Sequence, residues 1–290
     1  MTSLTVNKAD GKVLQDFLAA KFSLSRRTAK AMIDGRNVWV NRKCVWIASF
    51  ALRTGDSVEI PQQVVKGALK QGGAKGSRET ATKRHVRVLW SDESYLVCDK
   101  PAGMVSAADP KSVETLLRLQ EKIPTLQAVH RLDRDTTGCL MFAKNHAAFL
   151  AAVEVFKAHK VTKVYHAVTA GRFPFAHQII DEPLDGKSAV SKVVREAAGA
   201  DASFLRVRIE TGRTNQIRRH LAQVRYPIVG DRVFGLKSAR DPRLMQVPRQ
   251  MLHASTLTMS NPLSAHEEIK VHSPLPADFR ATLKLFGMGK

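Results

Sequence analysis

The sequence has few of the residues from which metal centres and disulfide frameworks are built. Its three cysteines are widely spaced and include no CxxC pair, so we expect free thiols rather than a zinc ribbon or a disulfide framework. Its ten histidines form no HExxH motif and no H-x-E motif with CxxC, which argues against zinc hydrolysis and zinc deamination. Nothing in the sequence requires a metal or another cofactor.

Long hydrophobic runs are also missing. A bilayer crossing demands roughly 20 consecutive apolar residues, and no stretch of the sequence approaches that length. The opening residues 1–14 lack the hydrophobic segment of a secretion signal. We therefore expect a soluble, cytoplasmic protein without a membrane partner.

Negative charge is scarce relative to positive charge. The 290 residues include 46 Lys and Arg against 26 Asp and Glu, which gives a formal net charge of +20. Such a field attracts polyanions, and phosphate neutralisation supplies most of the non-specific affinity for nucleic acid. Nucleic acid is therefore the expected partner. A basic surface that serves only solubility is the alternative, which net charge alone leaves open.

The pattern of residues 1–61 predicts a small module of two helices followed by short strands. Apolar residues repeat with helical spacing from Val13 onward, and Ser25 occupies the position of a helix N-cap ahead of a second helical run. Alternating valines then lead to a turn at Asn41 and Arg42. Two helices and a small sheet are therefore expected.

Positive charge gathers in this module. Arg26, Arg27 and Lys30 are spaced so that they share one face of the second helix. The stretch 24–41 resembles an S4 domain, with its LSRR-type second helix and its V-x-V-N strand. That resemblance implies binding of structured RNA, whereas a merely solvated helix face is the alternative. The residues expected to contact RNA are Arg26, Arg27, Lys30, Arg36, Arg42 and Lys43.

The rest of the chain divides into a linker and a larger domain. Residues 62–84 combine glycine, lysine and small polar residues, which predicts a flexible basic linker. In residues 85–290 strands and helices do not alternate strictly, so an α+β fold is favoured over a doubly wound sheet. Asn145 is expected to cap a helix that carries Phe149, Leu150, Val153 and Phe156.

The densest cluster of ionisable residues is the stretch HRLDRDTTG at 130–138, directly before the apolar run 139–143. It resembles the HRLD-x-x-T-S-G-L-L-L-F-A-K signature of the RluA-type pseudouridine synthases, and Asp133 falls on the catalytic aspartate of that family. The likeness covers about 85–280. It continues in DKPAG at 99–103, KVY at 163–165, AVS at 189–191, TGRTNQIR at 211–218, PIVGD at 227–231 and LHA at 252–254.

The resemblance implies an enzyme that isomerises specific uridines of structured RNA to pseudouridine. It also implies a catalytic domain over 85–290, built on a mixed, mainly antiparallel sheet flanked by helices. We expect a cofactor-free monomer that acts on ribosomal RNA, with transfer RNA as the alternative substrate. The alternative function is a catalytically inactive S4-type RNA-binding or ribosome-assembly protein. Retention of Asp133, Tyr165 and Arg218 together argues against inactivity.

The chemistry assigned to Asp133 is physically reasonable for a carboxylate. A negatively charged nucleophile can help to detach uracil from C1′ of the ribose, after which the base rejoins through C5. Both a covalent adduct and a glycal intermediate remain open. Hydrolysis of a glycosidic bond usually enlists two carboxylates, and Asp135 lies close in sequence, so a nucleosidase is a lower-ranked alternative.

Three further residues receive roles from the resemblance. Arg131 is expected to flip the uridine out of its stack, and its alternative is a simple ion pair with Asp133 or Asp135. Tyr165 is expected to stack on the extruded base, and its alternative is a packed core tyrosine. It shares its strand face with Lys163 and Ala167.

Arg218 is expected to pair with Asp133, with an ordinary surface arginine as the alternative. His130 and His220 are interpreted as structural. Three positions depart from the family motif, because Asn215 replaces His, Thr137 replaces Ser and Cys139 replaces Leu. These changes affect positioning more than chemistry.

Overall fold

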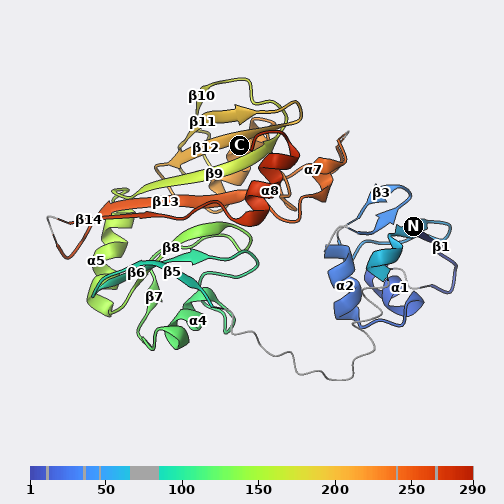
Figure 1. Ribbon diagram of the computed structural model, residues 1–290, viewed down its shortest axis with the longest axis horizontal. Coiled ribbons are helices and arrows are strands. Elements are labelled where there is room, and N and C mark those ends of the chain that lie inside the picture. The colour runs from blue at the N-terminus through green and yellow to red at the C-terminus, as the bar shows by residue number, and fades with distance from the viewer. Residues whose placement is uncertain are drawn as a thin grey trace. The chain divides into compact units, whose positions relative to one another are not determined.

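The protein is described here by a computed structural model that covers residues 1–10, 13–34, 37–45, 47–65, 85–239, 241–264 and 267–289. It divides into two compact units, Met1–Thr82 and Lys83–Lys290 (Figure 1). Each unit has a hydrophobic core of its own. Of the helices in the described ranges, none combines the length and the apolar character of a bilayer crossing.

The N-terminal unit contains two helices and a four-stranded antiparallel sheet with the order β1-β4-β2-β3. Leu14, Phe17, Ile33 and Val58 are almost completely buried and join the helices to the sheet in one core. The elements are β1 (Thr2–Thr5), α1 (Leu14–Lys21), α2 (Arg26–Asp34), β2 (Trp39–Val40), β3 (Lys43–Cys44) and β4 (Ser57–Ile60).

The local signals of this unit act as the sequence predicts. Ser25 Oγ accepts a hydrogen bond from the backbone NH of Thr28 at 3.1 Å and so caps α2. Asn41 and Arg42 join β2 to β3 with φ values of 50° and 63°, and such positive values suit a tight hairpin turn. The prediction of two helices and a small sheet is confirmed.

The predicted linker differs from the structure at its start. Residues 62–65 form a helical turn, and Val65 is buried in the core of the N-terminal unit. A single apolar pair among polar residues gives too little periodicity for a helix prediction, so tertiary packing decides the conformation here. The remainder of the predicted linker, 66–84, lies outside the described residues.

The C-terminal unit is built on a ten-stranded sheet in which β10-β11-β12-β9-β13-β8-β6-β5 are hydrogen-bonded in this order, β14 pairs with β13, and β7 pairs with β8. Among the described strands, β8 and β13 form the one parallel pair. The α+β prediction with a mainly antiparallel sheet is therefore confirmed. The elements are β5 (Arg87–Ser91), β6 (Tyr95–Lys100), α4 (Val113–Gln120), β7 (Gln127–Ala128), β8 (Thr137–Ala143), α5 (His146–Lys157), β9 (Thr162–Ala170), β10 (His177–Ile180), β11 (Ser191–Ala198), β12 (Ala202–Ile209), α6 (Gln216–Gln223), α7 (Arg243–Gln246), β13 (Leu252–Ser260), β14 (Glu268–His272) and α8 (Ala277–Leu285).

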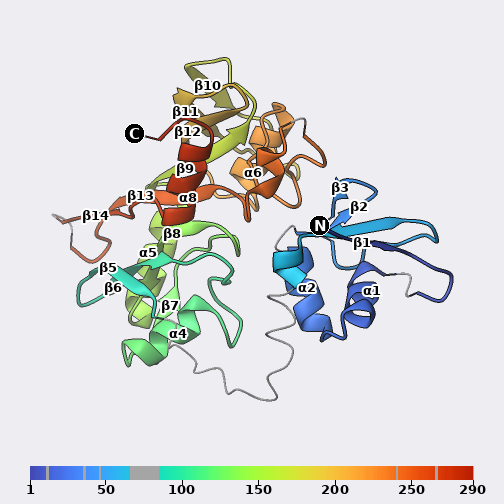
Figure 2. The same ribbon diagram turned by 45° about the vertical axis from the view of Figure 1, so that its right-hand side comes forward.

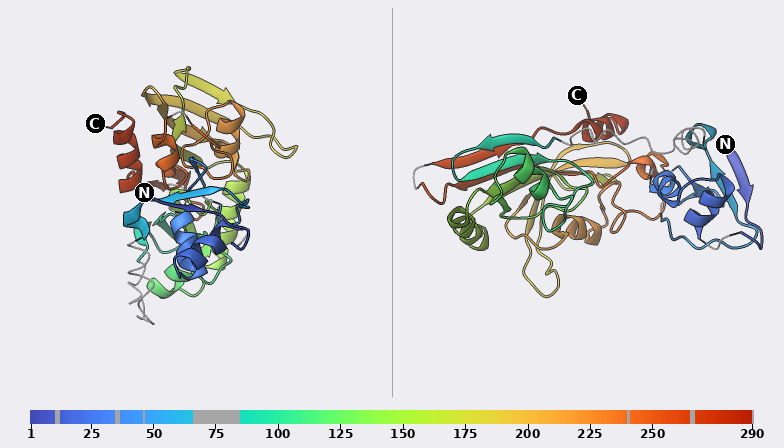
Figure 3. Two further views of the ribbon diagram at one scale, coloured as in Figure 1. Left: turned by 90° about the vertical axis from the view of Figure 1, so that its right-hand side faces the viewer. Right: turned by 90° about the horizontal axis from the view of Figure 1, so that it is seen from below.

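Helices cover both halves of this sheet. Helices α4 and α5 lie beside the half formed by β5 to β8, whereas α6 and α8 lie beside the half formed by β9 to β13 (Figures 1 and 2). The side chains of β8 alternate between two apolar clusters, because Leu140 belongs to one cluster and Met141 to the other. Figure 3 shows helices on both sides of the sheet, so β8 is buried along its whole length.

Helix α5 begins as predicted but buries a different stripe. Asn145 Oδ1 accepts from the backbone NH of Ala148 at 2.9 Å and caps the helix. The fully buried positions of α5 are Ala148 and Ala152, whereas Leu150 is 52% exposed. Small side chains therefore allow the helix to approach β8 closely, and Leu150 lies on the outer face.

Gly138 permits the close parallel contact between β8 and β13. It has a φ of +110°, and a Cβ added there would lie 2.1 Å from the backbone oxygen of Ala254. Only glycine tolerates both the backbone conformation and this close approach. Since Gly138 pairs with Ala254 in the register of β8 and β13, the loop before β8 is brought directly beside β13.

Candidate active site

Asp133 lies in the loop between β7 and β8, and local hydrogen bonds define the shape of this loop. Ser106 Oγ accepts from the NH of Leu132 and donates to the oxygen of Leu132, both at 3.0 Å. The NH of Thr136 donates to the oxygen of Asp133 at 3.1 Å, which closes a turn around the aspartate. The backbone on both sides of Asp133 is therefore fixed.

A buried lysine, Lys100, forms hydrogen bonds with the backbone of the same loop. Lys100 is completely buried, and its ammonium group donates to the backbone oxygens of Pro101, Met104 and Arg134 at 2.9, 2.6 and 2.8 Å. Burial lowers the pKa of Lys100 to about 8. The three carbonyl acceptors satisfy the donors of this ammonium group. Through these hydrogen bonds Lys100 joins the KPAG turn to the loop that carries Asp133.

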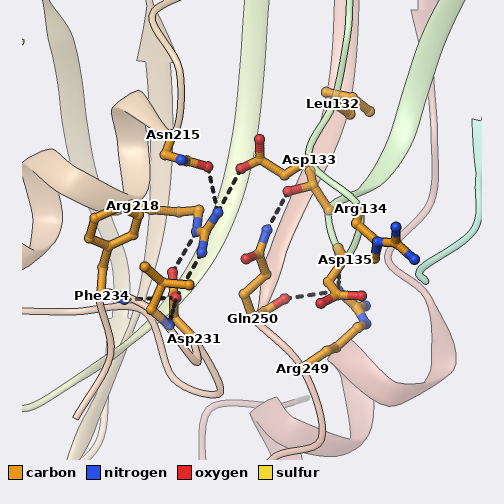
Figure 4. A network of polar contacts seen from close by, with 12 residues as sticks. Leu132, Asp133, Arg134, Asp135, Asn215, Arg218, Asp231, Phe234, Arg249 and Gln250 are labelled. Atoms are coloured by element: carbon orange, nitrogen blue, oxygen red, sulfur yellow. Dashed lines mark hydrogen bonds and ion pairs between the residues drawn. The ribbon is translucent and has the colours of Figure 1, made fainter. Parts of the chain in front are cut away.

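An arginine fixes the far side of the loop. Arg249 Nη1 donates to the oxygen of Asp135 at 3.1 Å, while its Nε lies 2.6 Å from Asp278 Oδ2. The adjacent Gln250 donates to Thr136 Oγ1 at 2.7 Å. Figure 4 shows Arg249 and Gln250 below Asp133 and Asp135. The loop is therefore attached through side chains to the segment before β13, and this segment is held to α8 by the pair of Arg249 with Asp278.

Arg218 on α6 is the centre of the polar network (Figure 4). Its Nη1 donates to Asp133 Oδ2 at 3.1 Å and to Asn215 Oδ1 at 2.5 Å. Its Nε and Nη2 donate to the two carboxylate oxygens of Asp231 at 2.6 and 2.9 Å. The ring of Phe234 lies 5.0 Å from the guanidinium carbon. Arg218 thus has a fixed orientation and one donor directed at Asp133.

Charge compensation makes this burial feasible. Arg218 is 8% exposed and Asp231 is 3% exposed. Burial alone would lower the pKa of Arg218, but Asp231 and Asp133 raise it above its usual value. Burial would likewise raise the pKa of Asp231, but Arg218 and the backbone NH groups of Phe234 and Val233 lower it. Both groups of the buried pair therefore stay charged at neutral pH.

Tyr165 lies on β9 beside the aspartate. It is 7% exposed, and Lys163 and Ala167 on the same strand face are also buried. Burial raises the pKa of Tyr165, and the negative charge of Asp133 raises it further. The phenol therefore keeps its proton at neutral pH. Tyr165 belongs to the large apolar cluster and also lines a pocket, so a place in the core does not exclude a contact with a base, and that contact stays a prediction.

Asp133, Tyr165 and Arg218 line one pocket of about 100 Å³, together with Arg131 and Asn215. The pocket combines a charged carboxylate, a fixed guanidinium and an aromatic ring from three segments that are distant in sequence. Such a site can bind a planar base while it presents a negative charge to the attached sugar.

Comparisons with known proteins agree with this geometry. The sequence model described as RNA pseudouridylate synthase matches residues 94–223, and that of the S4 domain matches residues 14–58. A ribosomal large subunit pseudouridine synthase D from Pseudomonas aeruginosa is 33% identical over 278 residues, which cover 85% of this chain and 85% of that protein. The chain belongs to the RNA pseudouridylate synthase family. It is therefore an enzyme that isomerises uridines in RNA to pseudouridine.

Other pseudouridine synthases support the assignment. The protein of the same name from Escherichia coli (strain K12) is 30% identical over 300 residues, covering 92% of this chain and 88% of that protein. The structure of human RNA pseudouridylate synthase domain containing 1 superposes with a TM-score of 0.58 at 24% identity, covering 70% of this chain and 90% of that chain. At this identity the structural likeness concerns the fold.

Arg131, the residue predicted to flip the uridine, has no ion-pair partner in the described ranges. Arg131 is exposed, lines the pocket and forms no ion pair with any residue in the described ranges. The alternative interpretation, a pair with Asp133 or Asp135, is therefore wrong. Asp135 itself is not among the residues that line the pocket, so the two carboxylates do not face each other across it. This arrangement disfavours the nucleosidase alternative.

The two histidines have structural roles, as predicted. His130 Nε2 accepts from the NH of Met141 at 3.1 Å, and its ring stacks on Phe156 at 4.9 Å. Burial and the charge of Lys163 lower the pKa of His130 to about 3, so it is neutral at physiological pH. His220 is fully buried and bonds to Ser191 Oγ at 3.0 Å.

The three departures from the family motif fit their surroundings. Asn215 has a left-handed φ of 54°, and its side chain binds Arg218 rather than a helical NH. Thr137 Oγ1 lies 2.9 Å from His253 Nδ1, while His253 Nε2 lies 3.0 Å from the oxygen of Ser273. Since a carbonyl only accepts, Nε2 carries the proton and Thr137 donates to Nδ1. Cys139 is buried on β8, with its thiol 3.7 Å from the backbone oxygens of Ser255 on β13 and Val271 on β14.

Two of the predicted RNA-binding residues are paired within the N-terminal unit. Arg26 Nε lies 2.7 Å from Asp16 and Lys30 Nζ lies 2.7 Å from Asp34, with 72% and 53% of the cationic side chains exposed. Exposed pairs of this kind have a small net energy. RNA phosphates can therefore compete with these carboxylates.

The remaining predicted RNA-binding residues belong to the second helix and the hairpin. Arg42 is exposed in the turn before β3, and Lys43 is exposed as the first residue of β3. Arg27 lies in α2, with a side chain outside the described part of the structure, and Arg36 lies outside the described residues. Their contacts with RNA stay predictions.

No role was predicted for Lys100, Asp231 or Arg249, although each fixes either the loop that carries Asp133 or the side chain of Arg218. Two of them could have been noticed in the sequence, because Lys100 is the first residue of the KPAG motif and Asp231 is the last residue of the PIVGD motif. A charged residue beside a buried apolar run usually has a buried partner. No local feature marks Arg249, because its partners come from distant segments.

We predict that Asp231→Asn destabilises the C-terminal unit by roughly 3–5 kcal/mol, because it leaves the buried charge of Arg218 undercompensated. The measurement is urea unfolding at pH 7. The folded-state pKa of Asp231 is lowered, so its stabilisation is present above the unfolded value of about 3.9 and is lost as pH falls through the lower folded value. The difference between variant and parent should shrink in that acid range.

Asp185→Asn is the matched control, because Asp185 forms a bidentate pair with Arg219 that is exposed. The unfolding free energy of this variant should change much less than that of Asp231→Asn. Equal effects of the two substitutions would contradict the importance given to the buried pair.

Proposed function

We propose that this pseudouridine synthase modifies ribosomal RNA and that Asp133 is its catalytic group. The observation that carries the proposal is the carboxylate of Asp133, which lines a pocket with Tyr165 and accepts from the buried Arg218 at 3.1 Å. A carboxylate oriented by a fixed guanidinium is pre-organised for attack or for charge stabilisation. The names of the relatives, which are ribosomal large subunit enzymes, support the substrate.

Asp133 acts on the bond between the base and the ribose. The bond from N1 to C1′ breaks, uracil turns within the pocket, a bond from C5 to C1′ forms, and the proton on C5 is released while N1 gains one. The base is retained, so one carboxylate suffices. Both the covalent adduct and the glycal route use the same negative charge beside C1′.

Tyr165 and Arg131 bring the uridine into this position. A uridine in a stack is inaccessible, so it must be extruded into the pocket. We propose that the side chain of Arg131 fills the space that the extruded uridine leaves in the RNA, because Arg131 is exposed and a guanidinium can stack on bases and bind phosphate. We propose that the extruded base stacks on the ring of Tyr165, because stacking of a base on an aromatic side chain stabilises binding by roughly 1–3 kcal/mol per base.

We propose that residues 1–61 select the RNA and that residues 85–290 perform the chemistry. The S4 match at 14–58 and the exposed cations of α2 and the β2–β3 hairpin support the first part. Transfer RNA is the second candidate substrate. We further propose that the protein acts as a monomer. A ribosomal substrate implies action in the cytoplasm.

We predict that Asp133→Asn lowers turnover by roughly 10⁴-fold, as removal of a nucleophile does in other enzymes. The measurement is tritium release from RNA that contains 5-tritiated uridine, because the label leaves C5 when the new bond forms. Equilibrium RNA binding should largely survive.

Asp135→Asn is the control, because this carboxylate lies two positions away but does not line the pocket. It should retain most of the turnover. Near-parental turnover in Asp133→Asn would remove the catalytic role from Asp133 and revive the alternative of an RNA-binding protein without this chemistry.

We predict that replacement of Arg26, Arg27 and Lys30 by alanine weakens RNA binding and flattens its salt dependence by roughly 0.7 log units for each lost single-strand phosphate contact. Asp16→Asn should have the opposite effect on affinity, because it frees Arg26 from its ion pair. Binding isotherms at several salt concentrations measure both. A triple variant with the parental salt slope would mean that α2 does not contact RNA.

A further inference from the structure

A second, larger pocket adjoins the active site. Its volume is about 460 Å³, which is within the range of roughly 300–1,000 Å³ typical of ligand sites. Arg131, Tyr165 and Gly212 line both this pocket and the pocket of Asp133. The two pockets are therefore neighbours, with these three residues in the walls of both.

The lining of the second pocket is positively charged. Its cationic residues are Arg131, Lys157, Lys163 and Arg213, and none of its lining residues is acidic. The ring of Phe156 provides an apolar wall. Lys157 is paired with Glu154 at 2.7 Å, but the lining as a whole carries an excess of positive charge and therefore favours an anionic ligand.

Lys163 has a buried ammonium group with few hydrogen-bond acceptors around it. It is 9% exposed, yet its ammonium group makes one hydrogen bond at the limiting distance of 3.5 Å, to the oxygen of Thr211. The ring of Phe156 lies 6.0 Å from it, and no carboxylate in the described ranges pairs with it. Burial lowers the pKa of Lys163. A buried ammonium group with unused donors is costly unless a partner arrives.

The other buried lysine, Lys100, has a full set of acceptors. Lys100 is also buried, but three carbonyl oxygens within 2.9 Å satisfy its three donors. Lys163 faces open space at the corresponding place. The fold thus satisfies one buried lysine internally and leaves the other free to bind an anion from outside.

We propose that the second pocket binds a backbone phosphodiester of the substrate RNA next to the extruded uridine, with Lys163 as its main ligand. The proposal rests on the assignment of the first pocket to that uridine. Lys163 and Tyr165 lie two residues apart on one face of β9, about 6.6 Å along the strand. A base on Tyr165 therefore brings its own chain past Lys163.

The test uses the full chain with Asp133→Asn, so that RNA is bound without turnover, and an in vitro transcript of large-subunit ribosomal RNA as the probe. Adding Lys163→Met should weaken binding by roughly tenfold or more, as expected for a lost hydrogen bond between charged groups. The salt slope should fall by about 0.7 log units. Lys163→Arg should restore most of both.

Thermal unfolding separates this role from a structural one. If Lys163 awaits a ligand, Lys163→Met removes a buried charge and should keep or raise the melting temperature of the protein without RNA. Lys192→Met is the matched control, because Lys192 is an exposed lysine paired with Glu210 at 2.5 Å and does not line the pocket. It should change RNA affinity far less.

Parental RNA affinity and salt slope in Lys163→Met would overturn the proposal, as would a lowered melting temperature with unchanged RNA binding. The role of Asp133 is judged separately, from tritium release in the protein with Lys163 intact. Failure of either assignment is therefore recognisable without the other.

Discussion

The active site depends on the guanidinium of Arg218, which is compensated on one side by Asp231 and directed on the other at Asp133. The planar fork allows one side chain to serve both carboxylates, which a lysine with its compact charge cannot do. Asp231 is almost completely buried, so the fork has little freedom to turn. Asn215 adds an acceptor to the nitrogen that binds Asp133, and this contact follows from the left-handed start of α6.

The rest of the C-terminal unit brings Asp133 to that guanidinium. Gly138 permits the parallel approach of β8 to β13, Lys100 and Arg249 hold the carbonyls of the loop, and β9 places Tyr165 beside it. These contacts join segments that are far apart in the sequence. Asp133, Tyr165 and Arg218 therefore acquire their geometry from the sheet, and all three line one pocket.

Local patterns in the sequence were sufficient to predict two helix caps and one hairpin turn. Ser25, Asn145 and the turn at Asn41 act through neighbours within a few residues, so their effects are readable directly. The ion pair of Asp133 with Arg218 came from the family likeness, and the structure contains it. By contrast, the exposure of Leu150 and the partners of Arg249 depend on which distant surfaces meet. Periodicity does not encode that information.

Single-turnover tritium release by Arg218→Lys tests the central claim most directly, because lysine keeps a positive charge but loses the fork. If orientation of Asp133 by Arg218 is essential, the rate should fall by roughly 10²-fold or more while RNA affinity is retained, as expected for a misplaced catalytic group. A folded variant that releases tritium at the parental rate would contradict the account.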